Sequence, residues 1–124
     1  MSENKTSKIR VLFCIAVSQN FFDLPGSDIP AVLAVYSKVF SQIANLPGLT
    51  LIGTFDDDRV MVGASSGWPW TSYILADVDH LDTAIAACNL FRTTPVGESR
   101  MWKYGRIEAR IGRELNIAAI SQPT

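Results

Sequence analysis

The feature that most constrains the fold is an almost continuously apolar run near the start of the chain, residues 9–17 (IRVLFCIAV). A helix that crosses a membrane needs about 20 apolar residues, so this run is too short to span a bilayer. Its length and its β-branched residues instead predict a strand that is buried on both faces. A second run, residues 70–78 (WTSYILADV), predicts another strand with an apolar centre.

A segment with helical periodicity follows the first strand. Apolar side chains recur at spacings of three and four from Val32 to Ile43, which predicts a helix that ends near residue 45. Ser27 or Asp28 is the expected N-cap, and Pro30 falls in the first turn, where its missing N–H has no helical partner to lose. The preceding residues, 21–27, contain a Pro-Gly pair and are expected to form a loop.

A second helix is predicted at residues 80–91, with Asp79 as its N-cap. Its expected buried stripe consists of Leu81, Ala84, Ile85 and Cys88. Strands are also predicted at residues 49–55 and 101–111, and residues 59–63 are a candidate for a short returning strand.

The resulting order, strand–helix–strand–strand–helix–strand, predicts an α+β fold of the ferredoxin-like βαββαβ type, with the first and third strands in the centre. The chain has 124 residues, the size of one domain. We expect one domain at residues 9–115, a disordered tail at 1–8 and a C-terminal tail at 116–124. Helices on one side leave the other face of such a sheet uncovered, which favours a homodimer closed into a dimeric α+β barrel.

The last predicted strand indicates which face would form the dimer. Side chains of a strand alternate between its two faces, so aromatic and charged residues share one face of residues 101–111. The residues expected at the dimer interface are Trp102, Tyr104, Arg106 and Glu108. A solvated edge strand is the alternative interpretation of the same pattern.

Charge and residue counts exclude several classes of function. Eleven basic residues face twelve acidic ones, so there is no basic surplus for nucleic acid, and the short apolar runs predict no membrane partner. Two cysteines in apolar segments predict reduced thiols in a cytoplasmic protein. One histidine excludes a multi-histidine metal site, and no dinucleotide fingerprint is present. We therefore expect neither a metal nor another cofactor.

Few residues are candidates for chemistry. His80 is the only histidine and a candidate general base, because its ordinary pKa suits proton transfer at neutral pH; an exposed first-turn residue is the alternative. The run Asp56–Asp58 favours a polar turn over a cation site, since consecutive carboxylates diverge in an extended chain.

Several further residues are candidates for a small-molecule pocket: Asn20, Phe21, Trp68, Trp70, Asn89 and Arg92. Trp68 and Trp70 fit the walls of a flat aromatic pocket, or alternatively ordinary core packing. Asn89 and Arg92 end the second predicted helix. They are either solvated or turned inward, where Arg92 would hold a carboxylate by paired hydrogen bonds.

Longer stretches of the chain resemble a known family. They are residues 11–23 (VLFCIAVSQNFFD), 53–63 (GTFDDDRVMVG), 67–78 (GWPWTSYILADV), 85–97 (IAACNLFRTTPVG) and 102–115 (WKYGRIEARIGREL). Together they resemble the IacB family, small proteins encoded with bacterial indole-3-acetic acid degradation genes. The resemblance implies a cytoplasmic role in auxin catabolism and a small aromatic acid as ligand. It supplies no established catalytic residues.

Three functions are compatible with this resemblance. The first is an enzyme that acts on an oxidised indole- or oxindole-acetate intermediate without metal or flavin, like cofactor-independent monooxygenases or small isomerases and lyases. The second is a non-catalytic binding or carrier protein, and the third is an accessory partner of another pathway enzyme. We expect an indole-type ligand between the helices and the sheet near residues 67–70. Trp68 and Trp70 would contact its ring, Asn20 and Asn89 would supply hydrogen bonds, and Arg92 would bind its carboxylate.

Overall fold

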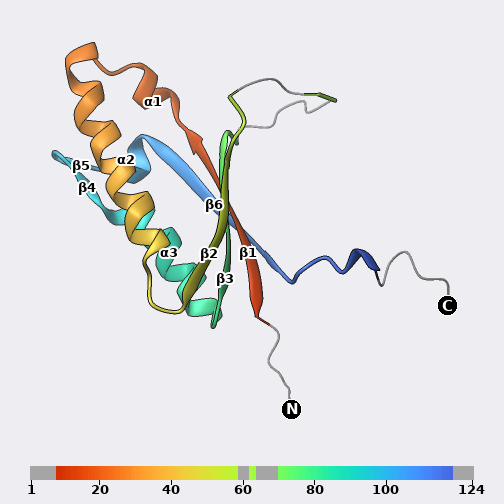
Figure 1. The fold of residues 1–124 in the computed structure, drawn as a ribbon. Helices are drawn as coiled ribbons and strands as arrows, with labels where there is room; N and C mark the ends of the chain where they lie inside the picture. The colour runs from red at the N-terminus through yellow and green to blue at the C-terminus, as the bar shows by residue number, and fades with distance from the viewer. Residues whose placement is uncertain (1–7, 59–61, 64–69, 119–124) are drawn as a thin grey trace.

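The computed structural model describes residues 8–58, 62–63 and 70–118, and its centre is a four-stranded antiparallel sheet (Figure 1). The order across the sheet is β2 (Leu49–Asp56), β3 (Ser72–Val78), β1 (Ile9–Val17) and β6 (Gly105–Gly112). The prediction that the first and third main strands are central is therefore confirmed. The candidate strand at 59–63 and the tails 1–7 and 119–124 lie outside the described residues, apart from positions 62 and 63.

Two long helices, α2 (Ile29–Ala44) and α3 (Leu81–Thr93), lie on the same side of the sheet (Figure 1). The predicted loop before α2 instead contains two short helical turns, α1 (Gln19–Phe22) and η1 (Gly26–Asp28). Asp28 is the residue at the N-cap of α2, and its side chain makes no capping hydrogen bond. This arrangement is compatible with the ferredoxin-like fold, and the α+β class is confirmed. None of the described helices is both long and apolar enough to cross a membrane.

The rotation of α3 differs from the prediction. The helix buries Ala84, Ala87 and Phe91, whereas Leu81 and Ile85 of the predicted stripe are exposed. Phe91 is fully buried and is the largest apolar side chain of the helix, so its burial determines which face packs on the sheet. The helix also starts one residue later than predicted, with His80 at its N-cap position.

The final strand is shorter than predicted because its first residues form other elements. A two-stranded hairpin, β4 (Pro95–Val96) with β5 (Ser99–Arg100), is followed by the 3-10 turn η2 (Met101–Lys103), and β6 starts only at Gly105. Tyr104 is buried in the core with the helices, so the expectation that it shares a strand face with Arg106 and Glu108 is wrong. The predicted alternation holds from Gly105 to Arg110, whereas Ile111, which was expected to face the helices, is exposed.

Strand register divides the sheet into two faces. Val11 and Phe13 of β1 lie opposite Ala76 and Ile74 of β3, and all four are buried beneath the helices. The residues between them point the other way. We call this second surface the open face; its members are Arg10, Leu12, Cys14 and Ala16 of β1, Tyr73, Leu75 and Asp77 of β3, Gly53 and Phe55 of β2, and Arg106, Glu108 and Arg110 of β6.

Candidate functional site

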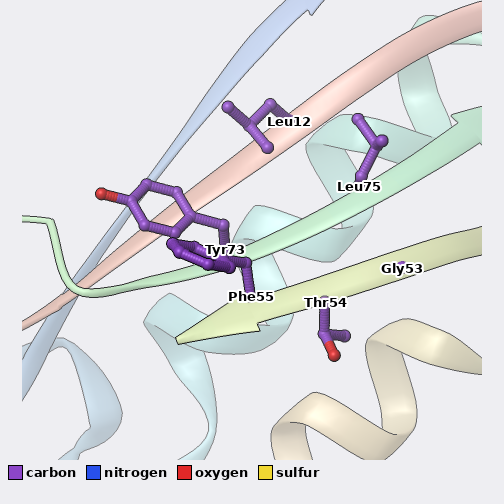
Figure 2. Close-up of a pocket in the computed structure, with 6 residues that line it drawn as sticks. All are labelled: Leu12, Gly53, Thr54, Phe55, Tyr73 and Leu75. Atoms are coloured by element: carbon purple, nitrogen blue, oxygen red, sulfur yellow. The ribbon is translucent and has the colours of Figure 1, made fainter. Parts of the chain in front are cut away.

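A hollow of about 440 Å³ lies on the open face, over strands β2, β3 and β1 (Figure 2). It is lined by Leu12, Gly53, Thr54, Phe55, Tyr73 and Leu75. In Figure 2 the Thr54 side chain points away from the rings of Phe55 and Tyr73, so Thr54 forms an edge of the hollow and not its floor. The lining is mostly apolar, which is typical of sites for flat, hydrophobic small molecules.

A β-bulge and a glycine together create this hollow. The pairing of β2 with β3 shifts between Leu51 and Gly53, so that Ile52 is the additional residue of the bulge. Without the shift, Ile52 would lie opposite Leu75 and its side chain would cover the floor of the hollow. With it, Gly53 lies opposite Leu75, and a Cβ atom built on Gly53 has no neighbour within 4 Å.

Two aromatic rings form one wall of the hollow. Phe55 and Tyr73 are cross-strand neighbours, with ring centroids 5.8 Å apart and planes inclined at 35°. Phe55 is 62% exposed, which is unusual for a phenylalanine and leaves its ring available for contact. The Tyr73 hydroxyl lies 3.3 Å from the carbonyl oxygen of Trp70 and 3.4 Å from Oδ2 of Asp57, so the wall carries one polar group with an acidic neighbour.

Charged residues border the hollow on two sides. On β6, Nη2 of Arg110 lies 3.0 Å from Oε2 of Glu108, and both side chains are about half exposed. Towards the start of β1, Nε of Arg10 donates a 2.7 Å hydrogen bond to Oδ1 of Asp77. This bond holds the pKa of Asp77 below its ordinary value. The open face therefore has an apolar centre and a charged border.

The thiol of Cys14 lies between the hollow and the charged border. Cys14 is opposite Tyr73 on one side and Glu108 on the other, and it is fully buried. Burial raises its pKa, and the neighbouring Arg110 only partly offsets this effect. A raised pKa keeps the thiol protonated at neutral pH, which makes Cys14 a poor nucleophile.

The predicted pocket residues at the start of the chain lie elsewhere. The Asn20 side chain donates a 3.0 Å hydrogen bond to the carbonyl of Lys103, next to η2. The Phe21 ring is on the helix side, with its centroid 6.2 Å from that of Tyr36. Trp70 is half-buried and contributes its carbonyl to Tyr73, while Trp68 lies outside the described residues.

The structure brings Arg92 together with two residues predicted for the dimer interface. The Arg92 guanidinium lies 5.0 Å from the centroid of the Trp102 ring, and the Arg106 guanidinium lies 4.6 Å from the same centroid. Arg106 also donates a 2.9 Å hydrogen bond to the Trp102 carbonyl. Asn89 is exposed on α3, one turn before Thr93. This cluster joins the end of α3 to η2 and lies apart from the hollow.

His80 is not among the residues that line the hollow. It follows the end of β3, and the nearest lining residue on that strand, Leu75, lies three residues from the last strand residue, Val78. At about 3.3 Å per residue, three residues of strand correspond to roughly 10 Å. The role of His80 as a general base stays a prediction.

Sequence reasoning missed Leu12, Phe55, Tyr73 and Leu75 as site residues. Alternation in the first and third main strands could have indicated Leu12 and Leu75, because each lies between residues that point into the core. The bulge at Ile52 has no sequence signal beyond the glycine that follows it. Within residues 8–58, 62–63 and 70–118, no group of three metal-ligating side chains is present.

Comparison with known proteins gives no relative from which to transfer a function. No protein-family model matches the chain. No curated protein matches it at a significant level either. The geometry of the hollow and the resemblance of the sequence are therefore the basis for any functional proposal.

Proposed function

We propose that this is a cytoplasmic protein of indole-3-acetic acid catabolism that binds an oxidised indole- or oxindole-acetate intermediate in the open-face hollow. The observation that carries the proposal is the hollow itself, about 440 Å³ of mostly apolar surface with the Phe55 and Tyr73 rings as one wall. A flat bicyclic ring system fits a cavity of this size and gains contact with both rings. The resemblance of the sequence supplies the pathway.

The proposed assembly is a homodimer in which two open faces pack against each other, as in a dimeric α+β barrel. The apolar centre of the face exposes part of Leu12, Phe55 and Leu75 to solvent in a single copy. The border carries both signs of charge, so a two-fold axis can place Glu108 of one copy near a cation of the other. Gly53 keeps space between the two sheets, and the hollow becomes an enclosed site.

Chemistry in this site would proceed without metal or flavin. An oxindole or hydroxylated indole is electron-rich and reacts with dioxygen once deprotonated. One oxygen atom enters the product, and the other leaves as water together with two hydrogens of the substrate, which supplies all four electrons. The Tyr73 hydroxyl, which lies near Oδ2 of Asp57, is the group at the hollow that is placed to exchange a proton with such a substrate. Tyr73→Phe should then lower turnover and leave binding almost unchanged.

Binding is tested first, with indole-3-acetate as the probe and calorimetry as the measurement. Gly53→Val adds a side chain opposite Leu75 and should abolish binding, because the new methyl groups occupy the hollow. Gly112→Val is the matched control: it also adds a side chain to open space on a strand, but at the far end of β6. Equal affinities for the wild type and Gly53→Val would contradict the proposed site.

Turnover is tested by incubating the purified protein with oxindole-3-acetate under air, followed by mass spectrometry. Gain of one oxygen atom with loss of two hydrogens indicates an oxygenase, and loss of water or an isomeric product indicates a lyase or isomerase. Binding without any change of mass or structure would favour the second candidate, a carrier. One observation supports that candidate: the six residues that line the hollow include no carboxylate, imidazole or thiol. Co-purification with another pathway enzyme would instead indicate an accessory partner.

A further inference from the structure

The charged border of the open face places one cation next to the hollow. Arg110 of β6 lies directly opposite Leu12 of β1, and Leu12 lines the hollow. Residues paired across adjacent strands have Cβ atoms about 5 Å apart and project from the same face. The long side chain of Arg110 therefore starts within one strand spacing of the apolar lining, and it is half exposed.

Other cations of the chain are less well placed for a ligand in the hollow. Arg10 is held in a two-point contact by the carboxylate of Asp77, with bonds of 2.7 and 3.3 Å. Arg92 belongs to α3, on the helix side of the sheet, and lies over the Trp102 ring. Arg106 reaches back to the carbonyl of the same tryptophan. Arg110 combines a place on the open face with a direct neighbour in the lining.

One partner of Arg110 in this structure is an anion, and the thiol of Cys14 is a second partner. Oε2 of Glu108 lies 3.0 Å from Nη2 of Arg110, two residues along the same strand face. The planar fork of N–H donors on a guanidinium matches a carboxylate, so the carboxylate of a ligand can take the place of Glu108. A half-exposed ion pair is weak, so replacing Glu108 with the carboxylate of a ligand costs little free energy.

We propose that Arg110 is the specificity residue of the hollow, and that it selects flat apolar ligands that carry a carboxylate. The ring lies between Leu12, Leu75 and the aromatic wall, and the carboxylate reaches over Leu12 to the guanidinium. Because Glu108 competes with the ligand for Arg110, the protein binds the ligand more weakly than it would without the Glu108 carboxylate. This inference rests on the proposed function and names the group that distinguishes acids from neutral rings.

The test compares two probes that share a ring, indole-3-acetate and 3-methylindole, in calorimetric titrations. Arg110→Gln should weaken indole-3-acetate about 5- to 20-fold and leave 3-methylindole unchanged, since only the acid loses a charge-assisted hydrogen bond. Glu108→Gln should strengthen indole-3-acetate about 2- to 5-fold by removing the competing carboxylate. Arg113→Gln is the matched control, because it removes the same charge from the exposed segment after β6.

The possible outcomes separate this inference from the proposed function. Tight 3-methylindole binding to the wild type, with an acid-to-neutral preference that falls only in Arg110→Gln, supports both. An unchanged preference in Arg110→Gln overturns the role of Arg110 and leaves the hollow intact. Equal weakening of both probes in Arg110→Gln also overturns it, because that pattern indicates a structural role. If neither probe binds the wild type, both the hollow and the role of Arg110 are contradicted.

Discussion

The two faces of the sheet are built from the same four strands and differ in almost every other respect. On the helix side, Val11 and Phe13 have no exposed surface and pack among the side chains of α2 and α3. On the open face, Leu12 between them is half-buried and Phe55 is 62% exposed. Because side chains alternate along a strand, a single segment such as β1 contributes to both surfaces. One face stabilises the fold, and the other is available for binding.

The packing of aromatic rings shows the same contrast. Phe91 contacts Tyr36 and Phe40 at centroid distances of 5.7 and 6.4 Å, which fills the space between helices and sheet with side chains. Core side chains therefore fill the space between the layers at these rings, whereas residues 67–69, near which the ligand was expected, lie outside the described residues. Phe55 and Tyr73 contact each other on the open face, with the hollow beside them. Predictions that compare matched residues on the two faces test this division.

The largest expected effect compares two phenylalanines. Phe91→Ala removes a fully buried ring and should lower the free energy of unfolding by about 3–5 kcal/mol, the usual range for such a cavity. Phe55→Ala, on the open face, should lower it by less than about 1 kcal/mol in the monomer. Urea unfolding followed by circular dichroism measures both. Similar losses for the two variants would contradict the division between faces.

The second-largest expected effect on stability compares two glycines. A Cβ atom at Gly105 would meet the Tyr36 hydroxyl and lie 2.8 Å from Cζ of Phe91, both in the core. Gly105→Ala should destabilise the protein by about 1–3 kcal/mol, as overpacking usually does. Gly53→Ala, on the open face, meets nothing within 4 Å and should change stability by less than about 0.5 kcal/mol. Thermal unfolding of both variants would show whether the two sites differ.

A buried hydrogen bond gives a smaller effect. The Tyr36 hydroxyl donates a 2.8 Å bond to the carbonyl of Tyr104, in the core beneath η2. Burial raises the pKa of Tyr36 well above its ordinary value, so the hydroxyl stays protonated as a donor. Tyr36→Phe leaves the carbonyl without this donor and should cost about 1–2 kcal/mol in urea unfolding. An unchanged midpoint would show that water or another donor replaces the hydroxyl.

The smallest effect concerns the ion pair on the open face. The hydrogen bond from Arg10 holds the pKa of Asp77 below its ordinary value, so the pair stabilises the fold when the carboxylate is ionised. Its contribution is present above the unfolded-state pKa, near 4, and is lost as the pH falls through the lower folded-state pKa. Asp77→Asn should therefore be less stable than the wild type at pH 6, and the difference should shrink as the pH falls below the unfolded-state pKa. A difference of constant size from pH 6 down to the acid-unfolding range would rule out this origin.

The part of the fold that could be predicted from the sequence depends on the helix-covered face. The apolar run that forms β1 and the helical spacing of α2 specify which residues avoid water, and this indicates strand order as well as element type. The predicted buried face of α3 was wrong because Leu81 and Ile85 form a second apolar stripe that competes with Phe91 for burial. Packing of the helix against η2 and β6 decides which stripe is buried. Sequence periodicity alone cannot rank two apolar stripes on one helix.

The candidate site could be predicted far less well. Polar and aromatic residues at element ends, such as Asn20 and Arg92, suggested a pocket. In the structure both side chains instead contact residues of η2. The hollow instead depends on a one-residue register shift, which places Gly53 where Ile52 would otherwise be. A shift of this kind follows from pairing between distant strands and leaves no local pattern.

The most direct test of the central claim, that the open face binds the ligand, is a titration with indole-3-acetate followed by methyl and aromatic NMR signals. Binding in the hollow should shift the signals of Leu12, Leu75, Phe55 and Tyr73. The signals of Val11 and Ile74, on the opposite face of the same strands, should stay unchanged. Shifts confined to the helix side, at Phe21 and the core residues, would contradict the account.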